Sequence, residues 1–91
     1  MQRVRVRVTG IVQGVGYRYA TARTAQHHGV TGWVRNRYDG SVEAELEGTD
    51  DAVAAVVAWM RHGPGGARVD GVETEPVAPT GDTGFTQEPT G

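Results

Sequence analysis

Positions 3 to 8 alternate strictly between arginine and valine. A period of two residues is typical of a half-buried β-strand, because successive side chains of a strand point to opposite faces of the sheet. Val4, Val6 and Val8 are therefore expected to pack against a core. We expect the arginine face to be solvated, and the Glu43, Glu45 and Glu47 face of a later strand to be solvated and paired with arginines.

A glycine-rich segment follows this strand and precedes a predicted helix. Gly10, Gly14 and Gly16 fall within seven residues, which argues against regular secondary structure there. Residues 17–28 contain good helix formers, and Gly29 stands at a C-cap position. The sequence thus predicts a strand, a glycine loop and a helix in succession.

The following residues predict a hairpin, a second helix and a last strand. Residues 30–47 form the hairpin, with a Tyr-Asp-Gly turn at 38–40. The second helix begins after Thr49, a favourable N-cap residue, and ends at the glycine-rich run that starts at Gly63. Residues 67–75 are the last clear strand.

This order of elements predicts an α+β fold, the ferredoxin-like βαββαβ sandwich. A four-stranded antiparallel sheet is expected to carry two helices on one face. The length of 91 residues supports one core, so residues 1–91 are expected to form a single domain. From about residue 76 prolines leave only a weak extended signal near residues 83–87, and the C-terminal tail is expected to be weakly structured.

The glycine loop is the first candidate for chemistry. A glycine-rich turn that leads into a helix can direct consecutive backbone N–H groups at an anion, and the helix N-terminus adds a partial positive charge. The loop lacks the Gly-Lys-Ser/Thr ending of a nucleotide-binding loop, so alone it also fits a merely tight turn. Arg18 favours the prediction that the loop binds an anion, because a cation in the first helical turn is unfavourable unless an anion lies nearby. Alone, Arg18 also fits a solvated surface arginine.

The register of the predicted hairpin identifies Asn36 as a second candidate. A three-residue turn at 38–40, with Gly40 at positive φ, sets Arg35 opposite Glu43, whereas a two-residue turn shifts the pairing by one residue. In the first register Asn36 lies on the covered face, where the pattern calls for an apolar side chain, and such exceptions often mark functional sites. The alternative is an ordinary polar residue at a fraying strand end.

Two motifs in this chain resemble those of the acylphosphatase family. Residues 10–18 read Gly-Ile-Val-Gln-Gly-Val-Gly-Tyr-Arg, and residues 32–36 read Gly-Trp-Val-Arg-Asn. The resemblance runs from residue 3 to residue 75. The chain departs from the family pattern at His28, where an aliphatic residue is usual, and at residues 87–89, where Gln-Glu-Pro replaces an apolar strand end.

The resemblance implies that the chain is a hydrolase that cleaves the carboxyl-phosphate bond of acyl phosphates. It implies two catalytic residues, with Arg18 and the backbone amides of the 10–16 loop holding the phosphate and Asn36 positioning the attacking water. The substrate phosphate would accept the water's proton, inorganic phosphate would be product or inhibitor, and no metal or cofactor is implied. The phosphate-binding set that it implies is Gln13, Gly14, Val15, Gly16, Tyr17 and Arg18, with Tyr17 more a core residue than a catalytic one.

Composition limits which classes of partner the chain can bind and in which compartment it is expected to work. The net charge of −2 gives no broad positive field, which disfavours binding to a polynucleotide. The N-terminal residues contain no continuous apolar stretch suited to a signal or a membrane span, and the absence of cysteine suits a reducing compartment. We expect a cytoplasmic monomer with no membrane partner. The three histidines lie near the predicted C-terminal ends of helices, where a capping role is commoner than a catalytic one. They are His27, His28 and His62.

Three alternatives stay open at this point. A module of the same fold could bind a phosphate-containing metabolite without turning it over. An RNA-binding ferredoxin-like domain is disfavoured because neither the first strand nor residues 42–46 carry an aromatic side chain. The chain also resembles the acylphosphatase-like domain of larger carbamoyl-transferring hydrogenase maturation proteins.

Overall fold

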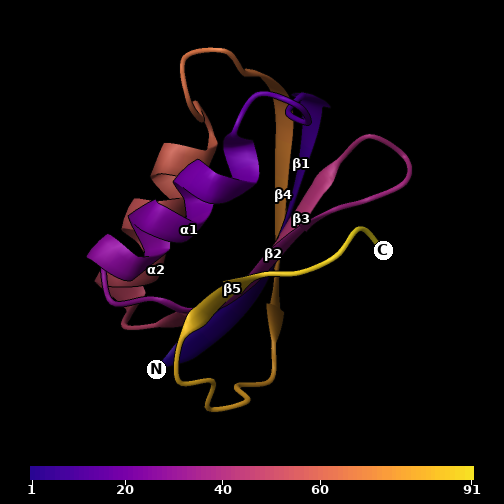
Figure 1. Cartoon of the computed structure of the whole chain (residues 1–91). Coiled ribbons are helices and arrows are strands. Elements are labelled where there is room, and N and C mark those ends of the chain that lie inside the picture. The colour runs from indigo at the N-terminus through magenta and orange to yellow at the C-terminus, as the bar shows by residue number, and fades with distance from the viewer.

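Five strands and two helices follow one another in the computed structural model, which describes residues 1–91 (Figure 1). The predicted βαββαβ order is confirmed, and one short strand is added after it. The expectation that regular structure ends before Gly10 is wrong, because Gly10 and Ile11 still pair with the fourth strand and the loop begins only after them. The elements are β1 (Gln2–Ile11), α1 (Tyr17–His27), β2 (Thr31–Asn36), β3 (Val42–Gly48), α2 (Asp50–Met60), β4 (Arg68–Val77) and β5 (Phe85–Gln87).

The sheet has the strand order β4-β1-β3-β2-β5. All pairs among the first four strands are antiparallel, as predicted, but β5 pairs in parallel with β2. The sheet is therefore mixed and five-stranded, where four antiparallel strands were expected. β5 lies where the sequence carries only a weak extended signal, and the buried ring of Phe85 beside Gly32 explains why this segment adds to the sheet.

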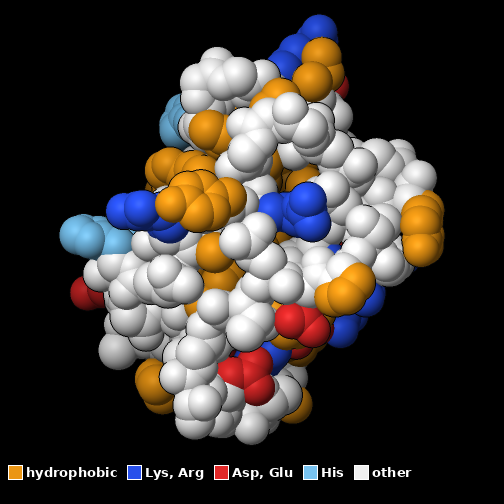
Figure 2. Space-filling model, in the orientation of Figure 1, with side chains coloured by type: hydrophobic (Ala, Val, Ile, Leu, Met, Phe, Trp, Pro, Cys, Tyr) orange, Lys and Arg blue, Asp and Glu red, His pale blue; other side chains and the backbone are white.

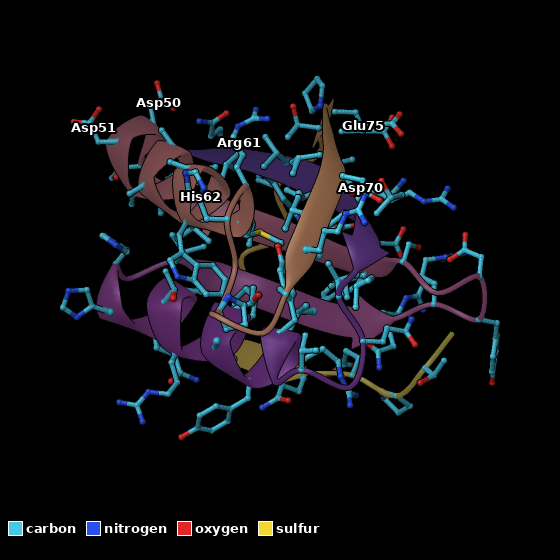
Figure 3. All side chains as sticks on the ribbon, turned by 90° about the horizontal axis from the view of Figure 1, so that it is seen from above. Asp50, Asp51, Arg61, His62, Asp70 and Glu75 are labelled. Atoms are coloured by element: carbon cyan, nitrogen blue, oxygen red, sulfur yellow. The ribbon has the colours of Figure 1, made fainter.

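The two helices cover one face of the sheet, and the core lies between them and the strands (Figures 1 and 3). Thr49 caps α2 as predicted, because its Oγ1 accepts a hydrogen bond from the N–H of Ala52 at 3.2 Å. Asp50 and Asp51 occupy the same end of α2, and Arg61 and His62 lie at the other end (Figure 3). Acidic residues at a helix N-terminus interact favourably with its dipole. Neither helix has the length and apolar composition needed to span a bilayer.

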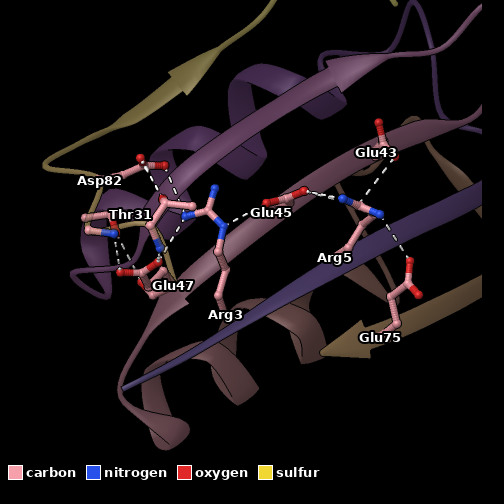
Figure 4. Close-up of polar contacts among 10 residues, drawn as sticks. Arg3, Arg5, Thr31, Glu43, Glu45, Glu47, Glu75 and Asp82 are labelled. Atoms are coloured by element: carbon pink, nitrogen blue, oxygen red, sulfur yellow. Dashed lines mark hydrogen bonds and ion pairs between the residues drawn. The ribbon is translucent and has the colours of Figure 1, made fainter. Parts of the chain in front are cut away.

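The opposite face of the sheet carries ion pairs between β1 and β3 (Figure 4). Arg3 Nε donates to Glu45 at 2.7 Å, and Arg3 Nη1 lies 3.1 Å from both Glu47 and Asp82. Only 2% of the Arg3 side chain is exposed. The expected pairing of arginines with glutamates is confirmed, but the expectation that this face is solvated is wrong at this end.

The segment between β4 and β5 is what buries these charges. The N–H groups of Thr80 and Gly81 donate to the two carboxylate oxygens of Glu47, at 2.8 and 3.1 Å. Asp82 then completes the shell around Arg3. This contact comes from residues more than thirty positions away from β3 in the chain, and a strand pattern read locally does not reveal it.

Replacing Arg3 is expected to destabilise the fold. Arg3→Met keeps most of the apolar volume but leaves Glu45 and Glu47 without their shared buried cation, which costs about 3 kcal/mol of unfolding free energy. Urea denaturation followed by circular dichroism measures this. Arg7→Met is the matched control, because Arg7 lies on the same face and is half-exposed, and its loss is expected to cost less than about 1 kcal/mol. Equal effects of the two substitutions would contradict the prediction.

The same carboxylates predict how stability depends on pH. Hydrogen bonds from the Thr80 N–H and from Arg3 lower the pKa of Glu47. Burial raises the pKa of Glu45, but hydrogen bonds from Arg3 and Arg5 outweigh burial, and the net pKa is lowered. Groups with a folded-state pKa below the unfolded value stabilise the fold above the unfolded pKa, about 4.3 for glutamate, and lose that contribution as the pH falls through the folded pKa.

We therefore expect the free energy of unfolding to decrease as the pH is lowered from about 5 to 3. Urea titrations at several pH values measure it. The decrease should be smaller in Arg3→Met, because the two glutamates lose a shared partner that lowers their pKa values. An unfolding free energy that stays constant over this range would contradict the argument.

Candidate functional site

The loop between β1 and α1 turns sharply at two glycines. Gly14 and Gly16 have φ angles of 76° and 79°, in the left-handed region that side chains with a Cβ disfavour. Gly16 is also the N-cap of α1 and offers no side-chain cap. From Gln13 to Tyr19, no backbone N–H donates a hydrogen bond to any group of the protein. Such a run of free N–H groups at a helix N-terminus suits an anion.

Arg18 stands in the first turn of α1 and is partly buried. Its guanidinium makes no hydrogen bond and no ion pair, whereas most arginines of the chain are paired with carboxylates. The paired arginines are Arg3, Arg5, Arg7, Arg35, Arg37 and Arg68. Arg18 is thus a cation without a protein partner, beside a run of N–H groups without partners.

Asn36 is the last residue of β2, and the predicted hairpin register is confirmed. Arg35 pairs with Glu43 and Asn36 with Val42, as a three-residue turn requires, and Gly40 has a φ of 92°. Asn36 consequently shares the helix-covered face of the sheet with Val42. Its side-chain Oδ1 is buried and has no hydrogen-bond partner. A buried polar atom without a partner is costly to folding and calls for a functional reason.

These groups meet at one small cavity of about 120 Å³. β1 and β2 both run antiparallel to β3, so they are parallel to each other. The loop after β1 and the C-terminal end of β2 therefore lie at the same end of the sheet. The lining residues are Val12, Gly14, Gly16, Tyr17, Arg18, Tyr19, Asn36 and Gln87.

Two residues of the expected phosphate-binding set do not line this cavity. The side chain of Gln13 turns away, and its Nε2 donates to the carbonyl oxygens of Arg37 and Ser41, each at 2.8 Å. Val15 packs against the edge of the hydrophobic core. Both still contribute backbone N–H groups to the free run. Gln13 moreover ties the glycine loop to the turn that follows Asn36.

Tyr17 has a structural role, as the sequence suggested. Its ring is buried, and its hydroxyl donates to the carbonyl oxygen of Met60 at 2.7 Å, which joins α1 to α2. Burial raises the pKa of the Tyr17 phenol well above its usual value. A neutral Tyr17 therefore holds the helix that carries Arg18.

Tyr19 and Gln87 line the cavity and were not expected from the sequence. For Tyr19 the signal was available, because it follows Arg18 by one residue. Gln87 could be placed only once β5 was known to pair with β2. The histidines lie exposed at helix ends, away from this lining, and the structure gathers no three of His, Asp or Glu into a group able to hold a metal.

The architecture is that of the ferredoxin-like α+β class. Its cavity lies at the loop that connects β1 to α1. The sequence profile of the acylphosphatase family matches residues 4–87. The chain is 63% identical over 71 residues to an acylphosphatase from Nitrobacter hamburgensis, covering 78% of this chain and 72% of the relative.

Solved structures agree with this likeness. The acylphosphatase from Bacillus subtilis superimposes with a TM-score of 0.94 at 32% identity, over 97% of this chain and 99% of that one. Full-length HypF in its phosphate- and nucleotide-bound form matches with a TM-score of 0.91 at 25% identity, over 98% of this chain but only 12% of HypF. The chain belongs to the acylphosphatase family, and the acylphosphatase assignment made from its motifs is confirmed.

Proposed function

We propose that the cavity at the start of α1 hydrolyses acyl phosphates, with Arg18 and the free N–H groups of Gln13 to Tyr19 binding the phosphate and Asn36 orienting the attacking water. One observation carries this proposal. The cavity brings together an arginine without a partner, a run of backbone donors without partners and a buried amide oxygen without a partner. A phosphate would satisfy the first two, and Asn36 is the lining residue whose amide can orient a water beside it.

The reaction asks little of the protein beyond positioning and charge stabilisation. An acyl phosphate is a mixed anhydride with a good carboxylate leaving group. The water oxygen forms a bond to phosphorus while the bond from phosphorus to the acyl oxygen breaks, and its electron pair leaves with the carboxylate. One water proton passes to a phosphoryl oxygen of the substrate, which gives dihydrogen phosphate. In-line positioning and stabilisation of the phosphoryl charge supply the rate enhancement.

The lining residues support this assignment of roles. Arg18 can grip two phosphoryl oxygens while the backbone N–H groups hold the others. Asn36 Oδ1 is an acceptor and can take a hydrogen bond from the water, which directs the oxygen lone pair at phosphorus. No carboxylate, histidine or cysteine lines the cavity, and this is consistent with the phosphate itself accepting the proton.

The surface offers less support for the alternatives. In the view of Figure 2, basic side chains are scattered among white and orange atoms and form no continuous patch of the kind that binds a polynucleotide backbone. A binding module without turnover would use only the NH2 donors of Asn36, whereas a role in orienting water uses its Oδ1 acceptor, and turnover separates the two. We further propose that the chain works as a cytoplasmic monomer, and the absence of cysteine suits the reducing compartment that this location implies. Light scattering of the purified protein tests the monomer.

The test of the proposed function is turnover of benzoyl phosphate by the purified protein, followed by loss of its ultraviolet absorbance and by release of inorganic phosphate. We expect saturable hydrolysis that inorganic phosphate inhibits competitively. Binding of phosphate without hydrolysis would support the binding-module alternative and overturn the proposal.

A further inference from the structure

Two exposed side chains, Tyr19 and Gln87, complete the lining of the phosphate cavity. The groups assigned to the phosphate and the water are the loop N–H groups, Arg18 and Asn36. With the phosphate at the loop N–H groups, the acyl part is expected to extend along the exposed part of the lining. Tyr19 and Gln87 are the side chains that it would meet there.

The position of Gln87 is fixed by its backbone. It ends β5 and pairs in parallel with Val34 of β2, so it lies on the same face of the sheet as Val34 and Asn36. The N–H of Glu88 donates to the carbonyl oxygen of Val34 at 2.8 Å, and the N–H of Gly91 donates to that of Asn36 at 3.0 Å. These two hydrogen bonds, made by residues that follow Gln87 in the chain, hold the backbone of Gln87 beside the end of β2.

The side-chain amide of Gln87 is free to bind a ligand. Its side chain makes no hydrogen bond to any protein group, although an apolar residue would suit this strand end, where Phe85 of the same face is buried. An amide offers both a donor and an acceptor. The Gln87 NH2 can donate to the carbonyl oxygen of any acyl group, whereas its Oε1 can accept only from an acyl group that carries an N–H or O–H.

Tyr19 also lines the cavity and contacts Arg23, one turn along α1. Tyr19 is 58% exposed, and its hydroxyl accepts a hydrogen bond from Arg23 Nη1 at 3.1 Å. The Arg23 guanidinium lies 5.8 Å from the centre of the ring. The aromatic ring is therefore available to pack against an acyl group, with its orientation constrained.

We propose that Gln87 is a specificity-determining residue, which contacts the acyl part of the substrate and favours acyl groups that carry a hydrogen-bonding N–H or O–H beside the carbonyl. The inference rests on the proposed function and deepens it. Acyl phosphates of that class would be processed more efficiently than others of the same size, because only they offer a donor to the amide oxygen of Gln87 in addition to the carbonyl acceptor that all acyl phosphates share.

The probes are carbamoyl phosphate and acetyl phosphate, which differ only by an amino group in place of a methyl group of similar size. The measured quantity is the ratio of kcat/KM for the first to that for the second, by release of inorganic phosphate after correction for spontaneous hydrolysis. Gln87→Leu removes the amide with little change in volume and is expected to lower the ratio about 5- to 10-fold, the effect of one hydrogen bond. The inhibition constant of inorganic phosphate should stay unchanged.

Thr86→Val is the matched control, because Thr86 precedes Gln87 on β5, points to the opposite face and does not line the cavity. It should leave the ratio unchanged. A Gln87→Leu ratio equal to that of the unchanged protein, or an equal loss for both substrates, would overturn the assignment of Gln87 while leaving the proposed function intact. Failure of the unchanged protein to hydrolyse either probe would overturn the proposed function and this inference together.

Discussion

Arg18→Gln is expected to weaken the inhibition by inorganic phosphate and to lower kcat/KM for benzoyl phosphate, each about 10²- to 10³-fold, since charged hydrogen bonds contribute about 1.5–3 kcal/mol each and the guanidinium can make two. Glutamine keeps a donor and much of the length but removes the charge and the fork-shaped pair of N–H groups. The phosphate would then be held by the backbone N–H groups of the loop alone. Initial rates at several phosphate concentrations give both quantities.

Arg61→Gln is the control for this substitution. Arg61 follows the end of α2, is exposed and, like Arg18, makes no hydrogen bond or ion pair, but it does not line the phosphate cavity. Its replacement should change neither quantity. Phosphate inhibition of Arg18→Gln at the level of the unchanged protein would refute the role of Arg18.

Asn36→Ala is expected to separate binding from turnover. If Asn36 orients the attacking water, its loss lowers kcat about 10²-fold or more, because misplacement of a nucleophile is costly to an in-line reaction. The phosphate ligands are untouched, so the inhibition constant of inorganic phosphate should change less than about 3-fold, well under one hydrogen bond. Steady-state kinetics of benzoyl phosphate with and without phosphate measure both.

Stability supplies a second readout for Asn36. Its Oδ1 and Thr21 Oγ1 are the buried side-chain polar atoms without a partner, and removing such an atom relieves its desolvation cost. Neither Asn36→Ala nor the control Thr21→Val should reduce the unfolding free energy, but only Asn36→Ala should lower kcat. A parallel fall of kcat and stability in Asn36→Ala would show that Asn36 serves the fold and not the reaction.

The fold follows largely from patterns within single segments. Alternating residues in β1 and β3, the glycine loop, Thr49 at the start of α2 and the turn at Gly40 each predict a local structure that the molecule adopts. These signals are reliable because they depend on side chains only a few residues apart. Even the hairpin register, and with it the face on which Asn36 lies, follows from the length of the turn.

What the sequence could not indicate depends on contacts between distant segments. β5 is three residues long, and its side chains gain a place in the sheet only beside Gly32 and Val34. The burial of Arg3 likewise depends on the segment around Gly81, which covers Glu47 from the far end of the chain. Neither effect leaves a periodic pattern in the residues that make it.

The candidate site divides in the same way. The sequence by itself predicted Arg18, Asn36 and the glycine loop as site candidates, because a glycine loop leads into a helix start and the strand order brings the end of β2 to the same end of the sheet. Only the tertiary structure decided that Gln13 turns away to hold the hairpin and that Gln87 turns toward the cavity. A side chain's direction there depends on which strand pairs with its own, and the free energy of that pairing lies in residues far away in the chain.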